Sequence, residues 1–228
     1  NTWLDADYAF AITPMMADIV AIQNLYGTPD ANTGDTTYGV NGNTGTYLDN
    51  ALDYSTPVTF TVFDTGGVDT FDFSTSSAHQ RLDLREETYS DLNGMDGNIG
   101  ISRGSVIENG YTGLGNDTLI GNDVGNGLSS GFGNDTVDGG AGNDAIRGGS
   151  GLDSLTGGDG FDLIEGGPGD NLVEGGAGGD LLIGGDVTLD TLTMIYSDWT
   201  PDPNTQTWLD DGDYILVWDD ILDDISIA

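Results

Sequence analysis

Residues 139–156 have the sequence GGAGNDAIRGGSGLDSLT, which is two copies of one nine-residue unit. The unit approximates Gly-Gly-x-Gly-x-Asp-x-apolar-x, and eight units follow one another without insertion from Thr112 to Ile183. A ninth unit begins at Gly184 and then fails. The eight units begin at Thr112, Gly121, Ser130, Gly139, Gly148, Gly157, Gly166 and Gly175.

The eighth position of every unit is aliphatic, a regularity that a disordered linker or a fibrous glycine repeat would not show. Collagen is excluded because glycine does not recur at every third residue. A glycine-rich turn followed by a short strand with one inward side chain predicts an all-β parallel β-roll (β-solenoid), with two units in each coil. The predicted interior column is Leu119, Leu128, Val137, Ile146, Leu155, Ile164, Val173 and Leu182.

Successive turns alternate between the two sides of such a roll, so the turns that stack are two units apart. One side then carries Asp117, Asp135, Asp153 and Asn171 at position six, and the other carries Asn126, Asp144, Asp162 and Asp180. Stacked carboxylates repel one another unless cations lie between them. With four turns on each side, about three ions fit between the turns of a side, roughly six in all, if calcium takes its usual six to eight oxygen ligands.

The chemistry of the turn indicates calcium. Glycine allows a tight turn that exposes backbone carbonyl groups, and position six adds a carboxylate. Hard oxygen ligands of this kind suit Ca²⁺, while the EF-hand pattern is absent. The predicted metal ligands in the repeat occupy positions two, four and six of six units: Gly113, Gly115, Asp117, Gly131, Gly133, Asp135, Gly140, Gly142, Asp144, Gly149, Gly151, Asp153, Gly158, Gly160, Asp162, Gly176, Gly178 and Asp180.

Two units depart from the pattern. In the unit at Gly121, Gly125 and Asn126 replace the usual pair, and in the unit at Gly166, Asp170 comes one place early and is followed by Asn171. We expect both turns to bind calcium weakly or not at all.

The composition favours cations as partners. Four basic residues face 39 acidic ones, a formal net charge of −35, so neither nucleic acid nor an anionic membrane is an expected partner. With no cysteine, disulfides and thiolate metal sites are excluded. We find no membrane-spanning apolar run and no signal peptide, and we expect Asn1 to be a processed or truncated end. A solvated, disordered acidic tail or a halophilic surface is the alternative. Disorder is disfavoured because 36% of the residues are hydrophobic and recur at regular spacing.

The flanking sequence predicts four segments. Residues 1–27 contain one helix, capped by Thr13 and ended by Gly27, with an apolar side that needs a larger body to pack on. Residues 28–111 form a β-rich lead-in, in which Val58–Phe63 and Thr70–Phe73 are strands joined by a hairpin-like link. Residues 112–186 form the roll. Residues 187–228 contain the strand-like stretch Tyr214–Trp218 and cap its open end.

Several stretches resemble the C-terminal region of the serralysin family of secreted zinc metalloproteases, with its RTX (repeats-in-toxin) β-roll. The likeness runs from about Pro14 to Gly185. The sequence PMMADIVAIQNLYG at residues 14–27 is similar to the closing helix of the protease domain. The resemblance is carried further by NTGDTTYG at 32–39, FDTGGVDTFDF at 63–73, VIEN at 106–109, and the repeats.

The resemblance implies calcium sites ahead of the roll. One would use the carbonyl groups of Asn32, Gly34 and Thr36 with Asp64, Gly66 and Asp69, although Asn32 replaces a residue that is usually arginine. A neighbouring site would use Gly67, Asp69, the carbonyl of Val106 and Glu108. Ordinary turn chemistry is the alternative for Asp64 and Asp69.

The resemblance also implies a missing catalytic domain upstream, which would hold the family's zinc in a His-Glu-x-x-His-x-x-Gly-x-x-His motif. This chain has one histidine, His79, which we expect to be a solvated loop residue, so the chain alone should be inactive. The family is secreted to the extracellular medium by a type I secretion machinery that reads an uncleaved C-terminal signal. The acidic-then-apolar end, Asp223–Ala228, fits that signal loosely.

Three functions remain open from the sequence. The first is a non-catalytic calcium-binding module of a secreted metalloendopeptidase, which aids export, folding and stability. The second is a stand-alone structural or adhesive β-roll, which would not need the helix at residues 14–27. The third is an enzyme of another class, for which no pair of carboxylates stands out by its spacing.

Overall fold

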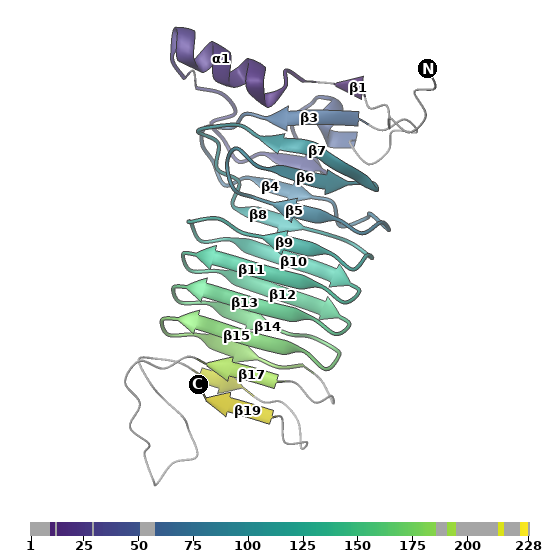
Figure 1. Cartoon of the computed structure of the whole chain (residues 1–228), viewed down its shortest axis with the longest axis vertical. Coiled ribbons are helices and arrows are strands. Elements are labelled where there is room, and N and C mark those ends of the chain that lie inside the picture. Colours follow the sequence, from purple (N-terminus) through teal and green to yellow (C-terminus); the bar gives the residue numbers. More distant parts are fainter. Residues whose placement is uncertain are drawn as a thin grey trace, which may run out of the picture.

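The computed structural model describes residues 10–11, 13–28, 30–50, 58–185, 191–194, 214–216 and 224–227. These residues form two sheets that run the length of the molecule, with one helix at the end that holds β1 and β3 (Figure 1). The predicted all-β parallel roll is therefore confirmed. Within the described residues, no helix is long and apolar enough to cross a membrane.

The larger sheet has eleven strands, and most of its neighbours pair in parallel. Antiparallel pairing occurs only where β6 meets β5 and β7, among the described strands. Its order is β1 (Phe10–Ala11), β3 (Val58–Val62), β7 (Met95–Ile101), β6 (Tyr89–Leu92), β5 (Arg81–Asp83), β9 (Thr118–Ile120), β11 (Thr136–Ala141), β13 (Ser154–Asp159), β15 (Leu172–Ala177), β17 (Thr191–Met194) and β19 (Asp224–Ile227).

The smaller sheet has eight strands, all parallel to their neighbours. Its order is β18 (Tyr214–Leu216), β16 (Leu181–Ile183), β14 (Leu163–Glu165), β12 (Ala145–Ser150), β10 (Gly127–Phe132), β8 (Asn109–Tyr111), β4 (Thr70–Asp72) and β2 (Thr37–Gly39). The short 3-10 helix η1 (Tyr47–Asn50) follows β2 in the chain.

Register across both sheets follows the two-unit coil. Val137 pairs with Leu119 and Leu155, and Ile146 pairs with Leu128 and Ile164. All eight position-eight side chains are at most 2% exposed, so they form the predicted interior column. Burial of that column, at roughly 1.5–3 kcal/mol for each aliphatic side chain, stabilises every coil against the next.

The same interior continues into the lead-in with larger side chains. Tyr38, Phe60, Phe71 and Phe73 are each at most 1% exposed. At the other end, β17, β18 and β19 extend the two sheets beyond the repeat. The proposed boundaries at residues 27, 111 and 186 stay predictions, because the sheets pass across them.

Two local predictions are wrong. The link between Val58–Val62 and Thr70–Asp72 is no hairpin, because β3 lies in the larger sheet and β4 in the smaller one. It is instead a turn of the roll, which carries the chain from one sheet to the other. Thr13 does not cap the helix: its hydroxyl group bonds to the backbone of Thr61.

Helix α1 (Met16–Tyr26) is capped instead by Asp18 in its first turn, whose carboxylate accepts a hydrogen bond from the Met15 N–H group. It ends as predicted at Gly27, which has a positive φ of 84°. Met16 is buried, but Leu25 is 74% exposed and Tyr26 is 84% exposed. The prediction that this helix packs on a larger body is therefore not met by the described residues and stays a prediction.

Candidate calcium-binding turns

The position-six side chains form two hydrogen-bonded columns, one along each edge of the roll. In the first, the backbone N–H groups of Asp117, Asp135 and Asp153 donate to the Oδ1 atoms of Asp135, Asp153 and Asn171, at 2.8–2.9 Å. In the second, Asn126, Asp144 and Asp162 donate in the same way to Asp144, Asp162 and Asp180, at 2.7–3.0 Å. The predicted stacking of turns two units apart is confirmed.

The second carboxylate oxygen has no partner in four of these turns. The Oδ2 atoms of Asp135, Asp144, Asp153 and Asp162 are buried and accept no hydrogen bond from any described residue. The four side chains are only 2–3% exposed. A buried carboxylate oxygen without a donor is costly, so each turn presents an unmet demand for positive charge.

Burial raises the pKa of these carboxyl groups, against the opposing effect of the backbone hydrogen bond that each accepts. The pKa values of Asp144 and Asp153 rise to about 6, with a further contribution from the neighbouring aspartates of the same column. The pKa values of Asp117, Asp135, Asp162 and Asp180 are also raised, first by burial. A bound cation would reverse this, because an adjacent positive charge favours the carboxylate.

The glycines at positions two and four allow the backbones of stacked turns to approach closely. A Cβ atom on Gly131 or Gly133 would collide with the carbonyl oxygen of Gly113 or Gly115, one coil away. Both glycines have positive φ, 96° and 132°. The carbonyl oxygens of one turn therefore lie close against the backbone of the next turn in the stack.

The glycine at position one also has a role, which was not predicted from the sequence. A Cβ atom on Gly148 would lie 2.6 Å from both the Oδ2 atom of Asp153 and the carbonyl oxygen of Gly166. Gly139, Gly157 and Gly175 face the aspartate of their own turn in the same way. The consensus glycine at this position signalled the role, since it leaves room for the orphaned oxygen.

These turns suit calcium better than a metal that needs several side-chain ligands. No group of three or more His, Cys, Asp or Glu side chains gathers in the part of the chain that the structure describes. The available donors are backbone carbonyl groups with single carboxylates, which are hard oxygen ligands in a loop geometry that Ca²⁺ accepts. The residues present therefore fit calcium, although the ligand set itself stays a prediction.

Asparagine changes the chemistry of two turns. The Nδ2 group of Asn171 donates to the carbonyl oxygens of Gly167 and Gly169, at 2.9 and 3.2 Å. The Nδ2 group of Asn126 donates to the carbonyl oxygen of Glu108 at 3.0 Å. In these two turns an amide N–H group points at carbonyl oxygens, whereas four other turns have a carboxylate oxygen without a donor among the described residues. Because the amide carries no negative charge and its N–H group already occupies carbonyl oxygens, this supports the expectation of weak calcium binding there.

The lead-in gathers part of its predicted site. Asp69 accepts a hydrogen bond from the Thr36 N–H group at 2.7 Å, and its own N–H group donates to Glu108 at 2.7 Å. The Oδ2 atom of Asp69 is buried and has no hydrogen-bond partner among the described residues. Burial, with smaller contributions from the charges of Asp64 and Glu108, raises the pKa of Asp69 to about 7. A Cβ atom on Gly67 would lie 2.6 Å from the carbonyl oxygen of Gly34.

The remaining lead-in candidates surround Asp64. Its carboxylate accepts a hydrogen bond from the Tyr38 hydroxyl group at 2.7 Å, and Asn32 donates to that hydroxyl group at 3.1 Å. The Gly66 N–H group lies 3.3 Å from the Oδ1 atom of Asp64. Ser105, which the sequence analysis did not single out, accepts the Asp64 N–H group at 3.0 Å, next to the exposed Val106.

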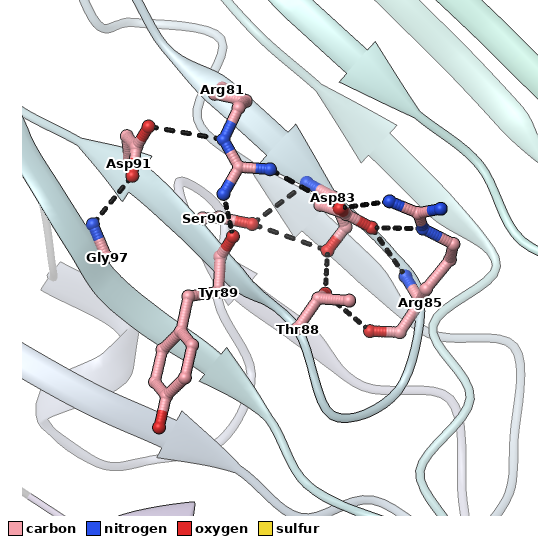
Figure 2. A network of polar contacts seen from close by, with 8 residues as sticks. All are labelled: Arg81, Asp83, Arg85, Thr88, Tyr89, Ser90, Asp91 and Gly97. Carbon is pink, nitrogen blue, oxygen red and sulfur yellow. Dashed lines mark hydrogen bonds and ion pairs between the residues drawn. The ribbon is translucent and has the colours of Figure 1, made fainter.

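Asp83 shows how a buried carboxylate is neutralised without metal (Figure 2). It is 2% exposed and forms ion pairs with Arg85 at 2.7 Å and with Arg81 at 3.3 Å. Burial would raise its pKa, but the hydrogen bonds and charge of Arg85 outweigh burial, and the pKa lies below its usual range. The orphaned aspartates of the repeat have the opposite shift because no arginine reaches them.

Proton release should accompany calcium binding. When osmolyte holds the metal-free chain folded, burial raises the pKa of Asp144 and Asp153 to about 6 and that of Asp69 to about 7, so calcium then displaces protons from these groups at pH 6 but hardly at pH 8. Titration calorimetry at pH 6 in two buffers of different ionisation enthalpy would count these protons. Equal apparent enthalpies in both buffers would contradict the prediction.

Without metal, the folded state should be more stable at low pH than at neutral pH. A carboxyl group whose pKa is higher in the folded than in the unfolded state stabilises the fold below about pH 4. That contribution is lost as the pH rises through about 6.

The two sheets and the stacked turns define a parallel β-roll repeat protein. A family model described as the C-terminal region of the serralysins, peptidase family M10, matches residues 28–224. The chain therefore belongs to the serralysin C-terminal family, as the resemblance predicted.

Similar proteins carry protease names. The chain is 45% identical over 129 residues to serralysin of Photorhabdus laumondii subsp. laumondii, covering 56% of this chain and 27% of that protein. It is 46% identical over 121 residues to serralysin B of Dickeya chrysanthemi, covering 53% and 25%. It is 44% identical over 119 residues to metallopeptidase AprA of Pseudomonas marginalis, covering 52% and 25%. The matched part spans about a quarter of these relatives.

Proposed function

We propose that this chain is the non-catalytic, calcium-binding part of a secreted serralysin-like metalloendopeptidase, which folds around calcium after export by a type I secretion machinery. The observation that carries the proposal is the set of four buried Oδ2 atoms without a donor in the described residues. Without cations these atoms oppose folding, and with cations they favour it. Binding free energy thereby becomes folding free energy.

The family names support the protease assignment over a stand-alone structural roll. The one histidine of this chain cannot supply the three-histidine zinc motif of the family's catalytic domain. His79 is exposed and lies in a loop, as expected, and its Nδ1 atom accepts a hydrogen bond from the Asn116 N–H group at 2.7 Å. Zinc and peptide hydrolysis belong to the catalytic domain that we expect upstream.

Calcium at about 1–10 mM should convert the metal-free chain to a β-rich form in one cooperative step, since extracellular sites of this kind bind in the range of about 10⁻⁴–10⁻³ M. Circular dichroism during a calcium titration measures the transition. Magnesium is the control, because it demands stricter octahedral geometry and dehydrates reluctantly. A spectrum that does not change with calcium would overturn the proposed function.

A further inference from the structure

The structure contains a turn of the roll that the repeat does not predict. Residues 75–83, with the sequence TSSAHQRLD, occupy the nine positions of a unit. Leu82 takes the inward eighth position, is 2% exposed and pairs in register with Leu119. Serine and alanine replace the glycines, and Gln80 replaces the aspartate, so the period is hidden in the sequence.

The backbone of this turn stacks on the turn Thr112–Asp117 in the manner of the regular repeats. The Leu114 N–H group donates to the carbonyl oxygen of Ser76 at 2.9 Å, as the Phe132 N–H group does to Gly113 at 2.8 Å. The same positions, two and three, are used in both pairs. The stacking of the regular turns is therefore continued by one coil toward the lead-in.

The side-chain ladder also continues. The Gln80 N–H group donates to the Oδ1 atom of Asp117 at 2.8 Å, which repeats the bond from Asp117 to Asp135. At position five, His79 Nδ1 accepts the Asn116 N–H group, as the Oδ1 atom of Asn116 accepts the Asn134 N–H group at 2.9 Å. Both columns of contacts thus reach residues 79 and 80.

Oxygen atoms converge between these two turns. A Cβ atom on Gly115 would lie 2.6 Å from the carbonyl oxygen of Ala78 and 2.5 Å from the Oδ1 atom of Asp117. A Cβ atom on Gly113 would collide with the carbonyl oxygen of Ser76. Carbonyl groups from positions two and four therefore approach the next turn as they do in the predicted calcium sites.

Gln80 adds an oxygen that no described residue satisfies. Its side chain is 4% exposed, and its Oε1 atom has no hydrogen-bond partner. Its Nε2 group donates to the carbonyl oxygen of Phe73 at 3.4 Å, two residues before the start of the turn. This orphaned oxygen occupies position six, where the regular turns have their orphaned carboxylate oxygens.

We propose that a further calcium ion binds between residues 75–80 and 112–117, held by the carbonyl oxygens of Ser76 and Ala78, the Oε1 atom of Gln80 and the carboxylate of Asp117. This inference rests on the proposed function and adds a site to it. A neutral amide replaces one carboxylate, and calcium binds more weakly when its ligands carry less negative charge. The site therefore fills after the repeat sites, and it joins the calcium columns to the lead-in.

Two substitutions at one position test the site. Gln80→Met removes the oxygen at similar length, and Gln80→Glu converts it to a carboxylate. Equilibrium dialysis of the whole chain against calcium should show one ion fewer for Gln80→Met than for the wild type. Gln80→Glu should bind its last ion about tenfold more tightly, by the effect of ligand charge. Gln23→Met, in α1, is the matched control and should bind as the wild type does.

The outcomes separate this site from the proposed function. If the wild type binds no calcium, the proposed function fails. If the wild type binds calcium but Gln80→Glu leaves the affinity for the last ion unchanged, this site alone is overturned, whether or not Gln80→Met folds. An unchanged ion count in a folded Gln80→Met variant would also overturn it.

Discussion

Replacement of Asp153 by Asn should have opposite effects on stability with and without calcium. The orphaned Oδ2 atom of Asp153 becomes an amide N–H group, which can donate to neighbouring carbonyl oxygens as Asn171 does. In chelator the variant should fold more readily than the wild type, by on the order of 1 kcal/mol after allowance for solvent screening, because a buried carboxylate with a raised pKa is removed. With saturating calcium it should be less stable and should bind at least one ion fewer.

Asp153→Ala is the comparison that isolates the two roles of the side chain. It removes the ligand and also the Oδ1 atom that accepts the Asp135 N–H group at 2.9 Å. With calcium we expect a loss of about 3–5 kcal/mol, the usual cost of removing one partner of a buried charge pair. Chemical denaturation at saturating calcium measures this loss, and an osmolyte titration in chelator measures folding without metal. If Asp153→Asn weakens folding equally in both conditions, Asp153 is not a calcium ligand.

The second large effect should come from Gly151→Ala. Gly151 has a φ of 150°, and an added Cβ atom would collide with the carbonyl oxygen of Gly133. The backbone strain alone costs about 1–3 kcal/mol. Displacement of the Gly133 carbonyl group, a predicted ligand, adds the loss of a calcium contact. Each kcal/mol lowers Tm by about 2–4 °C in a chain of this size, so thermal unfolding in calcium should shift by several degrees.

Gly94→Ala is the matched control for this substitution. Gly94 also has a positive φ, 73°, but an added Cβ atom would meet nothing within 4 Å. The Gly94→Ala variant therefore has backbone strain without a collision, and it should bind as many calcium ions as the wild type. Equal losses of stability in the two variants, with unchanged calcium binding in Gly151→Ala, would contradict the role of the close carbonyl approach.

The apparent calcium midpoint is a poor measure of either change. If roughly six ions bind in one cooperative step, a loss of about 3 kcal/mol is divided among them and shifts the midpoint only about twofold. Ion counts and unfolding at fixed calcium therefore test the ligands more sharply than the midpoint does.

The sequence by itself determined the roll, its interior column at position eight and its columns of turn side chains at position six. A strict nine-residue period places each aliphatic side chain inward and each position-six side chain at a turn, whatever the rest of the chain does. Such local information suffices because every coil contacts only its neighbours.

Only the tertiary structure decided what lies beside the repeat. It separated β3 from β4 into different sheets, surrounded Asp83 with Arg81 and Arg85, and stacked the irregular turn at Gln80 on the turn at Asp117. These contacts join residues that are far apart in the chain and share no period. They are set by register across the sheets, and that register depends on how the two sheets together enclose the large side chains of the lead-in core.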